Sequence, residues 1–363
     1  MKIPLTDLKS QYNSIKEDID TAINEILDKT NFIMGDVVRN FEEKLSKFCN
    51  CKYAIGVSSG SSALFLALKA YGVKEGDEII TVPNSFIATA EAIIHCGAKP
   101  VFVDVDEKTM LIDVKKIEEK ITKKTKAILP VHLYGQICDM DPIIEIAKKH
   151  NLIILEDAAQ AIGAEYKEKN LPIFETAIFS FFPAKNLGCY GDGGAVITNN
   201  KEVADKVAKL RDHGRINKYE SDIIGYGERL DALQAAILNV KLKYLKEWTK
   251  KRRENAKIYD KLLNNIIQVP YEEKNNKHVY YMYEIRIKDR EKLMAFLKEN
   301  NIDTGIHYPI PLHLQQSLKF LGYKEGDFPV TEKLSKEILS LPIFPELKEE
   351  NIKFICEKIK EFL

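Results

Sequence analysis

Several features that would assign this chain to a common class are missing from its sequence. Lys plus Arg and Asp plus Glu both number 54 in 363 residues, so no excess charge of one sign attracts the protein to nucleic acid or to an anionic membrane. No apolar run reaches the ~20 residues of a membrane span, and charged residues stand where a secretory signal needs an apolar stretch. We therefore expect a cytoplasmic protein with a small-molecule partner, and no nucleic-acid or membrane partner.

Metal-binding and nucleotide-binding signatures are missing as well. The six cysteines include no Cys-x-x-Cys and the seven histidines no His-x-x-x-His, so we predict no metal site. The phosphate-loop motif of ATP-binding proteins does not occur, and Gly191-Asp-Gly-Gly-Ala195 lacks the third glycine of the dinucleotide motif. Both absences argue against ATP and NAD, although a generic phosphate-binding protein such as a dehydrogenase stays an alternative.

Alternation of apolar runs and helical patterns organises the first two thirds of the chain. Such alternation indicates crossover units and a mostly parallel sheet with helices on both faces. The seven predicted strands are Ala54 to Val57, Glu78 to Val82, Pro100 to Val105, Ala127 to Val131, Leu152 to Glu156, Ala177 to Phe182 and Gly194 to Thr198. The sequence therefore predicts an α/β domain around a seven-stranded sheet.

The length of the chain favours two domains. Apolar spacing predicts helices over Ser10 to Leu27 and Arg229 to Trp248, and the boundary is placed at the end of the second. We expect a large domain over residues 1–248 and a smaller C-terminal α+β domain over 249–363. The second domain has a predicted strand at Val279 to Ile287 and predicted helices at Arg290 to Glu299 and Lys348 to Phe362.

Three segments carry residues suited to chemistry. The turn before the predicted helix Ala63 to Ala70 reads Ser58-Ser-Gly-Ser-Ser62, and free N–H groups at a helix start suit a phosphate, although serine is also an ordinary capping residue. Asp157 ends an apolar strand, where strand alternation sends it and Glu156 to opposite sides. Lys185 follows another apolar strand, where partial desolvation would lower its pKa and suit a Schiff base.

Taken together, eight motifs resemble the DegT/DnrJ/EryC1/StrS family of sugar aminotransferases over nearly the whole chain. The motifs are Gly60-Ser-Ser-Ala63, Phe86-Ile-Ala-Thr89, His132-Leu-Tyr-Gly135, Glu156-Asp-Ala-Ala-Gln160, Ser180-Phe-Phe-Pro-Ala-Lys185, Gly191-Asp-Gly-Gly194, Arg229-Leu-Asp with Gln234-Ala-Ala236, and His307-Tyr-Pro309. The resemblance implies the fold of aspartate aminotransferase, called fold type I, the cofactor pyridoxal 5′-phosphate, and a homodimer with shared active sites.

The resemblance also implies a role for individual residues. Lys185 would hold the cofactor as a Schiff base and carry a proton, and Asp157 would pair with the ring nitrogen. Phe86 would stack on the ring and Gln160 would contact its hydroxyl. The phosphate would be held by Gly60, Ser61, Ser62 and Ser180. The substrate would be bound by Arg215, Arg229, His307, Tyr308 and His313, each of which has a purely structural alternative.

The resemblance implies a transfer of the amino group from glutamate to a nucleotide-linked keto sugar, in polysaccharide or deoxyaminosugar biosynthesis. We expect C3 of a dTDP- or UDP-linked 3-keto sugar. The alternatives are C4 of a 4-keto-6-deoxy sugar and a non-catalytic, cofactor-binding regulator. Lys185 argues against the related dehydratases, which have His there. One departure stands out: the family commonly has Gly-x-Asn, with the Asn reaching the partner's phosphate, where this chain has Gly225-Tyr-Gly227.

Overall fold

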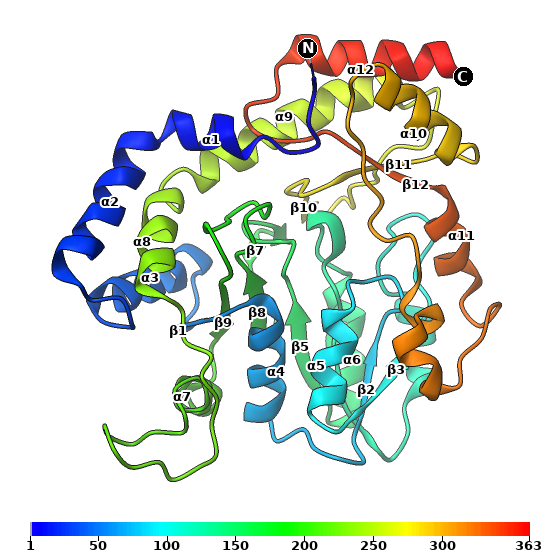
Figure 1. Ribbon diagram of the computed structural model, residues 1–363. Coiled ribbons are helices and arrows are strands. Elements are labelled where there is room, and N and C mark those ends of the chain that lie inside the picture. The colour runs from blue at the N-terminus through cyan, green and yellow to red at the C-terminus, as the bar shows by residue number, and fades with distance from the viewer. Residues whose placement is uncertain (1) are drawn as a thin grey trace.

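A seven-stranded sheet forms the centre of the computed structural model, which describes residues 2–363 (Figure 1). The strand order is β1-β9-β8-β5-β4-β2-β3, and all neighbours are parallel except β9, which runs antiparallel to β1 and β8. The strands are β1 (Tyr53–Val57), β2 (Glu78–Thr81), β3 (Lys99–Phe102), β4 (Thr125–Ile128), β5 (Ile153–Asp157), β8 (Thr176–Ser180) and β9 (Gly194–Thr198). The predicted α/β class and mostly parallel sheet are confirmed, and each predicted strand overlaps an observed one.

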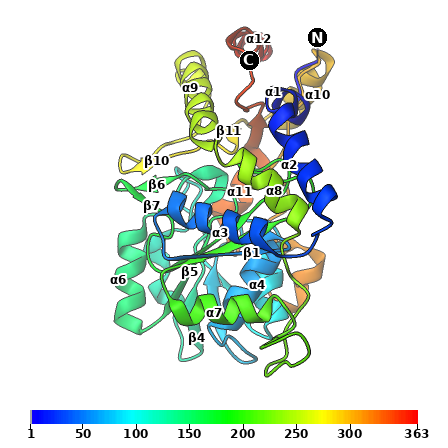
Figure 2. The ribbon, with the colours of Figure 1, turned by 90° about the vertical axis from the view of Figure 1, so that its left-hand side faces the viewer.

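Helices cover both faces of this sheet, because the side chains of each strand alternate between the two faces. Ile79 and Leu155 pack with one group of helices, whereas Ile80 and Ile154 pack with the other. Figure 2 shows α4 and α6 on opposite sides of the strands. The first group is α4 (Gly60–Ala70), α5 (Ala88–His95) and α7 (Lys201–Leu210), and the second is α3 (Asp36–Cys49), α6 (Met140–His150) and α8 (Ala232–Lys241).

Two predicted helices are each interrupted. The predicted helix from Ser10 to Leu27 is α1 (Leu8–Ser14) followed by α2 (Lys16–Lys29), with Ile15 outside helical geometry. The predicted helix from Arg229 to Trp248 is α8 followed by α9 (Leu245–Leu263). The apolar spacing runs on through both breaks because the residues beside them pack into one shared cluster, so periodicity alone does not show the break.

The C-terminal part is a small α+β unit with its own apolar cluster, formed by β11, β12, α9, α10 and α12. The division into residues 1–248 and 249–363 stays a prediction: α9 runs across that boundary, and Ile3 packs into the C-terminal cluster. The elements of the C-terminal part after α9 are β11 (Tyr283–Arg286), α10 (Arg290–Glu299), α11 (Pro329–Glu337), β12 (Ile338–Leu341) and α12 (Glu349–Phe362). A small separate sheet has the order β10-β6-β7, with β6 (Glu165–Tyr166), β7 (Lys169–Asn170) and β10 (Asn276–Lys277).

Candidate functional site

A cavity of about 420 Å³ lies beside the carboxyl ends of β5 and β8. Ligands of open parallel sheets bind at this edge, because the loops that leave the strands converge there. The cavity is lined by the turn that starts α4, the start of α5, the end of β5, the loop after β8, and two tyrosines of the C-terminal part. Its lining includes Ser59, Gly60, Ser61, Ser85, Phe86, Thr89, Asp157, Gln160, Ser180, Phe182, Lys185, Asp192, Tyr281 and Tyr308.

Lys185 lines the cavity from the loop that follows β8. Its backbone N–H donates to the carbonyl of Phe182 at 2.8 Å, and its Nζ lies 4.2 Å from the ring centre of Tyr281. Burial lowers the pKa of Lys185 to about 8, although the nearby carboxylate of Asp157 acts in the opposite direction. A lysine with this pKa has a substantial neutral fraction near pH 8, and only the neutral amine is a nucleophile.

Asp157 lines the cavity from the end of β5, and only 4% of its surface is exposed. Thr89 Oγ1 donates to one carboxylate oxygen at 2.8 Å and the N–H of Ala159 donates to the other at 3.2 Å. Burial raises the pKa of Asp157, whereas these two hydrogen bonds lower it. Glu156 does not line this cavity and lies 3.0 Å from His132 Nε2, as the strand alternation predicts.

The turn at the start of α4 forms an anion cradle together with Ser180. Ser59 caps the helix by accepting the N–H of Ser62 at 3.0 Å, and the N–H groups of Gly60 and Ser61 have no partner within the helix. A Cβ on Gly60 would lie 2.7 Å from the Cβ of Ser180, so glycine is what allows Ser180 to approach the turn. The geometry fits a phosphate group, which needs several convergent donors.

Aromatic and amide side chains from both parts of the chain form one wall of the cavity. Phe86 is 53% exposed, and its ring centre is 5.8 Å from that of Tyr308. Gln160 accepts the N–H of Tyr134 at 2.7 Å and donates to the hydroxyl of Tyr308 at 3.3 Å. The structure therefore places Phe86, Gln160 and Tyr308 together, with Phe86 free to contact a flat ring in the cavity.

Most of the predicted substrate residues lie outside this cavity in the single chain. Arg215 and Arg229 both face Asp212, at 3.7 and 2.6 Å. His313 is 1% exposed and its Nε2 lies 2.9 Å from Glu332, while the Nδ1 of His307 lies 2.6 Å from Ser340 Oγ. Of the five residues, only Tyr308 lines the cavity, and Ser62 is the one predicted phosphate ligand outside its lining.

Thr89 and Tyr281 line the cavity but were not among the predicted site residues. Thr89 belongs to the motif Phe86-Ile-Ala-Thr89, and its position in the first turn of α5 is a signal that could have indicated an inward side chain. Tyr281 stands in the aromatic run Tyr280-Tyr-Met-Tyr283, where no local signal shows which ring faces Lys185. A contact between segments 96 residues apart depends on how the two parts of the chain pack.

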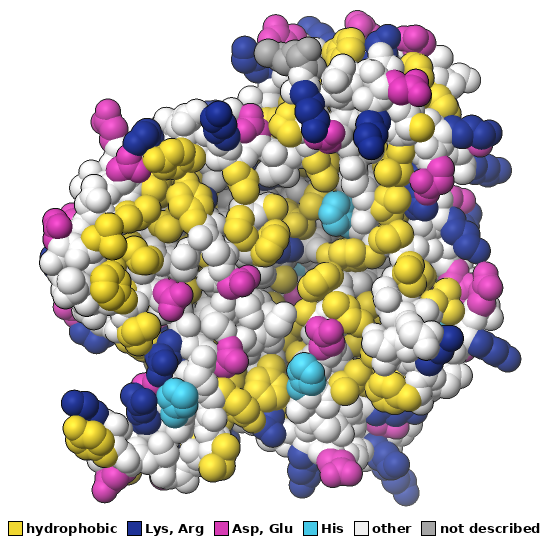
Figure 3. All heavy atoms as spheres, in the orientation of Figure 1, with side chains coloured by type: hydrophobic (Ala, Val, Ile, Leu, Met, Phe, Trp, Pro, Cys, Tyr) yellow, Lys and Arg dark blue, Asp and Glu magenta, His cyan; other side chains and the backbone are white. Residues whose placement is uncertain are grey.

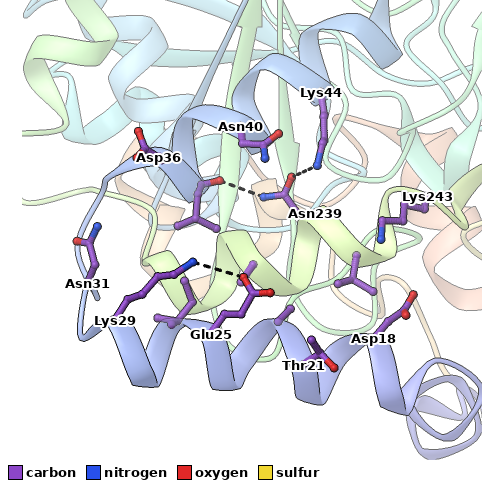
Figure 4. Close-up of a pocket in the computed structure, with 15 residues that line it drawn as sticks. Asp18, Thr21, Glu25, Lys29, Asn31, Asp36, Asn40, Lys44, Asn239 and Lys243 are labelled. Carbon is purple, nitrogen blue, oxygen red and sulfur yellow. Dashed lines mark hydrogen bonds and ion pairs between the residues drawn. The ribbon is translucent and has the colours of Figure 1, made fainter.

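A second hollow of about 490 Å³ lies between α2, α3 and α8 (Figure 4). It contains none of the predicted site residues. Charged and amide side chains surround it, among them Asp18, Glu25, Lys29 and Lys44, and Asn239 lies between Lys44 and the backbone of Val37. Separately, every helix in residues 2–363 falls short of the length and hydropathy needed to cross a membrane.

A low-pKa lysine that shares a cavity with a buried carboxylate, beside an anion cradle at the carboxyl edge of the sheet, is the arrangement that a pyridoxal phosphate enzyme requires. The model of the DegT/DnrJ/EryC1/StrS aminotransferase family matches residues 13–360, and the chain belongs to this family. It is an aminotransferase that uses pyridoxal 5′-phosphate. The fold-type-I expectation drawn from the sequence is thereby confirmed.

Curated relatives match the chain from end to end. A protein of Geobacillus stearothermophilus named pleiotropic regulatory protein is 48% identical, covering 100% of this chain and 99% of its own. A dTDP-3-amino-3,6-dideoxy-alpha-D-galactopyranose transaminase of Aneurinibacillus thermoaerophilus is 43% identical, with 99% of each covered. A UDP-2-acetamido-2-deoxy-3-oxo-D-glucuronate aminotransferase of Pseudomonas aeruginosa is 42% identical, with 98% of each covered.

Solved structures also match over nearly the whole chain. DesV of S. venezuelae, determined in complex with a ketimine intermediate, superposes with a TM-score of 0.98 at 37% identity, covering 99% of this chain and 98% of its own. NtdA of Bacillus subtilis, determined with bound PMP cofactor, superposes with a TM-score of 0.92 at 34% identity, covering 99% of this chain and 85% of its own.

Proposed function

We propose that the chain transfers an amino group from glutamate to a nucleotide-linked keto sugar, at C3 of a dTDP- or UDP-linked 3-keto sugar. The observation that carries the proposal is that Lys185 and Asp157 line one cavity of about 420 Å³ beside an anion cradle. The names of the Aneurinibacillus and Pseudomonas relatives, which specify 3-amino and 3-oxo sugars, support the choice of C3. A 4-keto-6-deoxy sugar aminated at C4 is the alternative substrate.

The cavity has groups suited to each part of pyridoxal 5′-phosphate. Lys185 would hold the cofactor covalently through Nζ, Asp157 its ring nitrogen, Phe86 its ring face and Gln160 its hydroxyl region. The cradle of Gly60, Ser61, Ser62 and Ser180 is the proposed phosphate end. When bound, the cofactor supplies an aldehyde carbon that reacts with amines and a ring that accepts an electron pair.

The protein's own groups bind, orient and move protons. Thr89 and the N–H of Ala159 favour the charged form of Asp157, against the effect of burial, so that it can hold a protonated nitrogen opposite it. Lys185 is the one lysine in the lining of the cavity, and its Nζ moves the proton that amino transfer requires. The ring of Tyr281 covers that amine on one side and limits the access of water.

We further propose a homodimer with shared active sites. Large hydrophobic side chains are exposed at the end of α2 and in the loop between α7 and α8, including Leu27 at 48%, Ile33 at 53% and Ile224 at 89%. Figure 3 shows hydrophobic side chains gathered over α2 and α8 on one face, and a second copy of the chain would cover them. In a dimer with shared active sites, Arg215 and Arg229 would reach the partner's cavity, where the diphosphate of a sugar nucleotide needs cations.

His307 and Tyr308 remain the proposed sugar contacts of this chain. Tyr308 lines the cavity beside Phe86, and His307 is the residue before it. His313 has no such support, because it is buried against Glu332.

A substrate panel tests the proposed activity. Purified protein is incubated with glutamate and with dTDP-, UDP- and GDP-linked 3-keto and 4-keto sugars, and the products are read by mass spectrometry. We expect amination of a 3-keto sugar linked to dTDP or UDP, and loss of both turnover and the visible absorbance of bound cofactor in Lys185→Ala. Amination of 4-keto sugars alone would contradict the choice of C3.

The name of the Geobacillus relative favours a second candidate, a cofactor-binding regulator without catalytic activity. The presence of both Lys185 and Asp157 in the cavity argues against it, because together they provide the amine and the acid that amino transfer requires. A protein that binds the cofactor but aminates no sugar in the panel would support the regulator.

A further inference from the structure

Glu228 occupies an unusual place beside the cradle. It follows Gly227, where the family's common Asn is missing, and its Oε2 accepts the hydroxyl of Ser62 at 2.6 Å and also the hydroxyl of Ser58. The backbone of the same residue accepts the N–H of Ser58 at 3.0 Å. A segment 166 residues away in the chain is thereby tied to the first turn of α4.

The hydrogen-bond capacity of Ser62 is used up by these contacts. A serine hydroxyl has one proton to donate, and that of Ser62 goes to the carboxylate of Glu228. The Oγ of Ser62 also lies 2.8 Å from Ser58 Oγ and 2.9 Å from Ser59 Oγ, and its N–H donates to Ser59 Oγ at 3.0 Å. A phosphate dianion only accepts hydrogen bonds, so Ser62 has nothing to offer it unless a charge-assisted bond breaks.

The lining of the cavity agrees with this count. Gly60, Ser61 and Ser180 face the cavity, whereas Ser62 and Glu228 are outside its lining. The carboxylate is therefore separated from the cradle by the serine that it binds, which limits its repulsion of a bound anion.

We infer that Glu228 is a positioning residue that withdraws Ser62 from the phosphate grip. The grip then consists of the N–H groups of Gly60 and Ser61 and the hydroxyls of Ser61 and Ser180. This inference rests on the phosphate end assigned under the proposed function, and it corrects the place of Ser62 in that set.

The test measures how much the phosphate contributes to cofactor binding. Holoenzyme is dialysed to equilibrium against graded concentrations of pyridoxal 5′-phosphate or of pyridoxal, and visible absorbance gives the bound fraction. The ratio of the two dissociation constants is the phosphate preference, which a general loss of structure would not change selectively. Ser62→Ala is measured in the wild-type, Glu228→Met and Glu228→Gln backgrounds, with Ser61→Ala as the reference for a direct ligand.

We expect Ser61→Ala to lower the phosphate preference about tenfold or more, as loss of a hydrogen bond to a charged group does. Ser62→Ala changes it less than about twofold in the wild type, but about tenfold in Glu228→Met, where the freed hydroxyl can turn to the phosphate. Glu228→Gln keeps an acceptor in the same place and leaves Ser62 without effect. Glu228→Ser, whose side chain is too short to reach Ser62, replaces the methionine variant if that protein does not fold.

Two results would overturn the inference. One is a tenfold loss for Ser62→Ala in the wild type, which would make Ser62 a direct ligand. The other is a phosphate preference that Ser62→Ala leaves unchanged in every background, which would show that Glu228 does not control phosphate binding through Ser62. Failure of the proposed function looks different: then Ser61→Ala and Ser180→Ala would also leave the preference unchanged.

Discussion

Replacement of Thr89 by valine would test how the protein controls the acid in its active site. Valine has the shape of threonine without the hydroxyl, so Asp157 would lose its donor at 2.8 Å and keep only the N–H of Ala159 at 3.2 Å. A hydrogen bond to a charged group contributes about 1.5 to 3 kcal/mol, and 1.36 kcal/mol corresponds to one pKa unit. The pKa of Asp157, already raised by burial, should therefore rise by about 1 to 2 further units.

The direction of the pH effect follows from the form that Asp157 needs. In the proposed function it acts as a carboxylate, so a higher pKa leaves less of the active form at low pH and the same amount at high pH. In Thr89→Val the acid limb of kcat/KM should move up by about 1 to 2 pH units, with activity recovered as the pH is raised further. Thr89→Ser keeps the hydroxyl and should keep the wild-type profile. A valine variant whose acid limb coincides with that of the wild type would refute this account.

Three other predictions concern single residues. Because burial lowers the pKa of Lys185 to about 8, its covalent capture of pyridoxal phosphate should slow about tenfold per pH unit below about 7 in stopped-flow measurements, and a constant rate down to pH 6 would contradict this. Gly60→Ala should weaken cofactor binding about tenfold, as measured by equilibrium dialysis, because the new Cβ would lie 2.7 Å from Ser180. Unchanged binding would contradict the proposal that this turn and Ser180 hold the phosphate. Burial lowers the pKa of His278 to about 3, so stability is full above about pH 6.5 and falls as the pH drops and the unfolded chain takes up the proton. His278→Asn keeps an acceptor for the N–H of Tyr280. In urea titrations, the free energy of unfolding of this variant should fall by about 2 kcal/mol less than that of the wild type between pH 7 and pH 5.

Features set by neighbouring residues could be predicted from the sequence. The strand Ile153–Asp157 is an apolar run whose alternation separates Glu156 from Asp157, and the helix Arg290–Glu299 has the predicted bounds. The positions of Asp157 and Lys185 follow from the same logic, because each comes at the carboxyl end of a strand and parallel strands bring those ends to one edge.

Features set by packing between distant segments could not be predicted. The break at Ile15 lies inside a continuous apolar pattern, because Ile15 leaves helical geometry (φ −131°, ψ 21°) and still packs into the cluster with Ile237 and Trp248. His313 was predicted to bind the substrate, but its ring is buried against Glu332, a partner 19 residues further along the chain. No spacing rule distinguishes a buried histidine from one that faces a ligand.

The segment from Gly225 to Arg229 combines a feature that is visible in the sequence with one that depends on packing. The missing Asn at Gly227 is visible in the sequence, but its consequence depends on a contact between Glu228 and a serine 166 residues away. In isolation, a carboxylate next to a phosphate site looks unfavourable. In the fold, it accepts hydrogen bonds from the hydroxyls of Ser58 and Ser62, and neither of these serines lines the cavity. The proposed phosphate site therefore combines a departure that is visible in the sequence, at Gly227, with a contact that only the fold reveals, and it should depend more on Ser61 and Ser180 than the motif alone suggests.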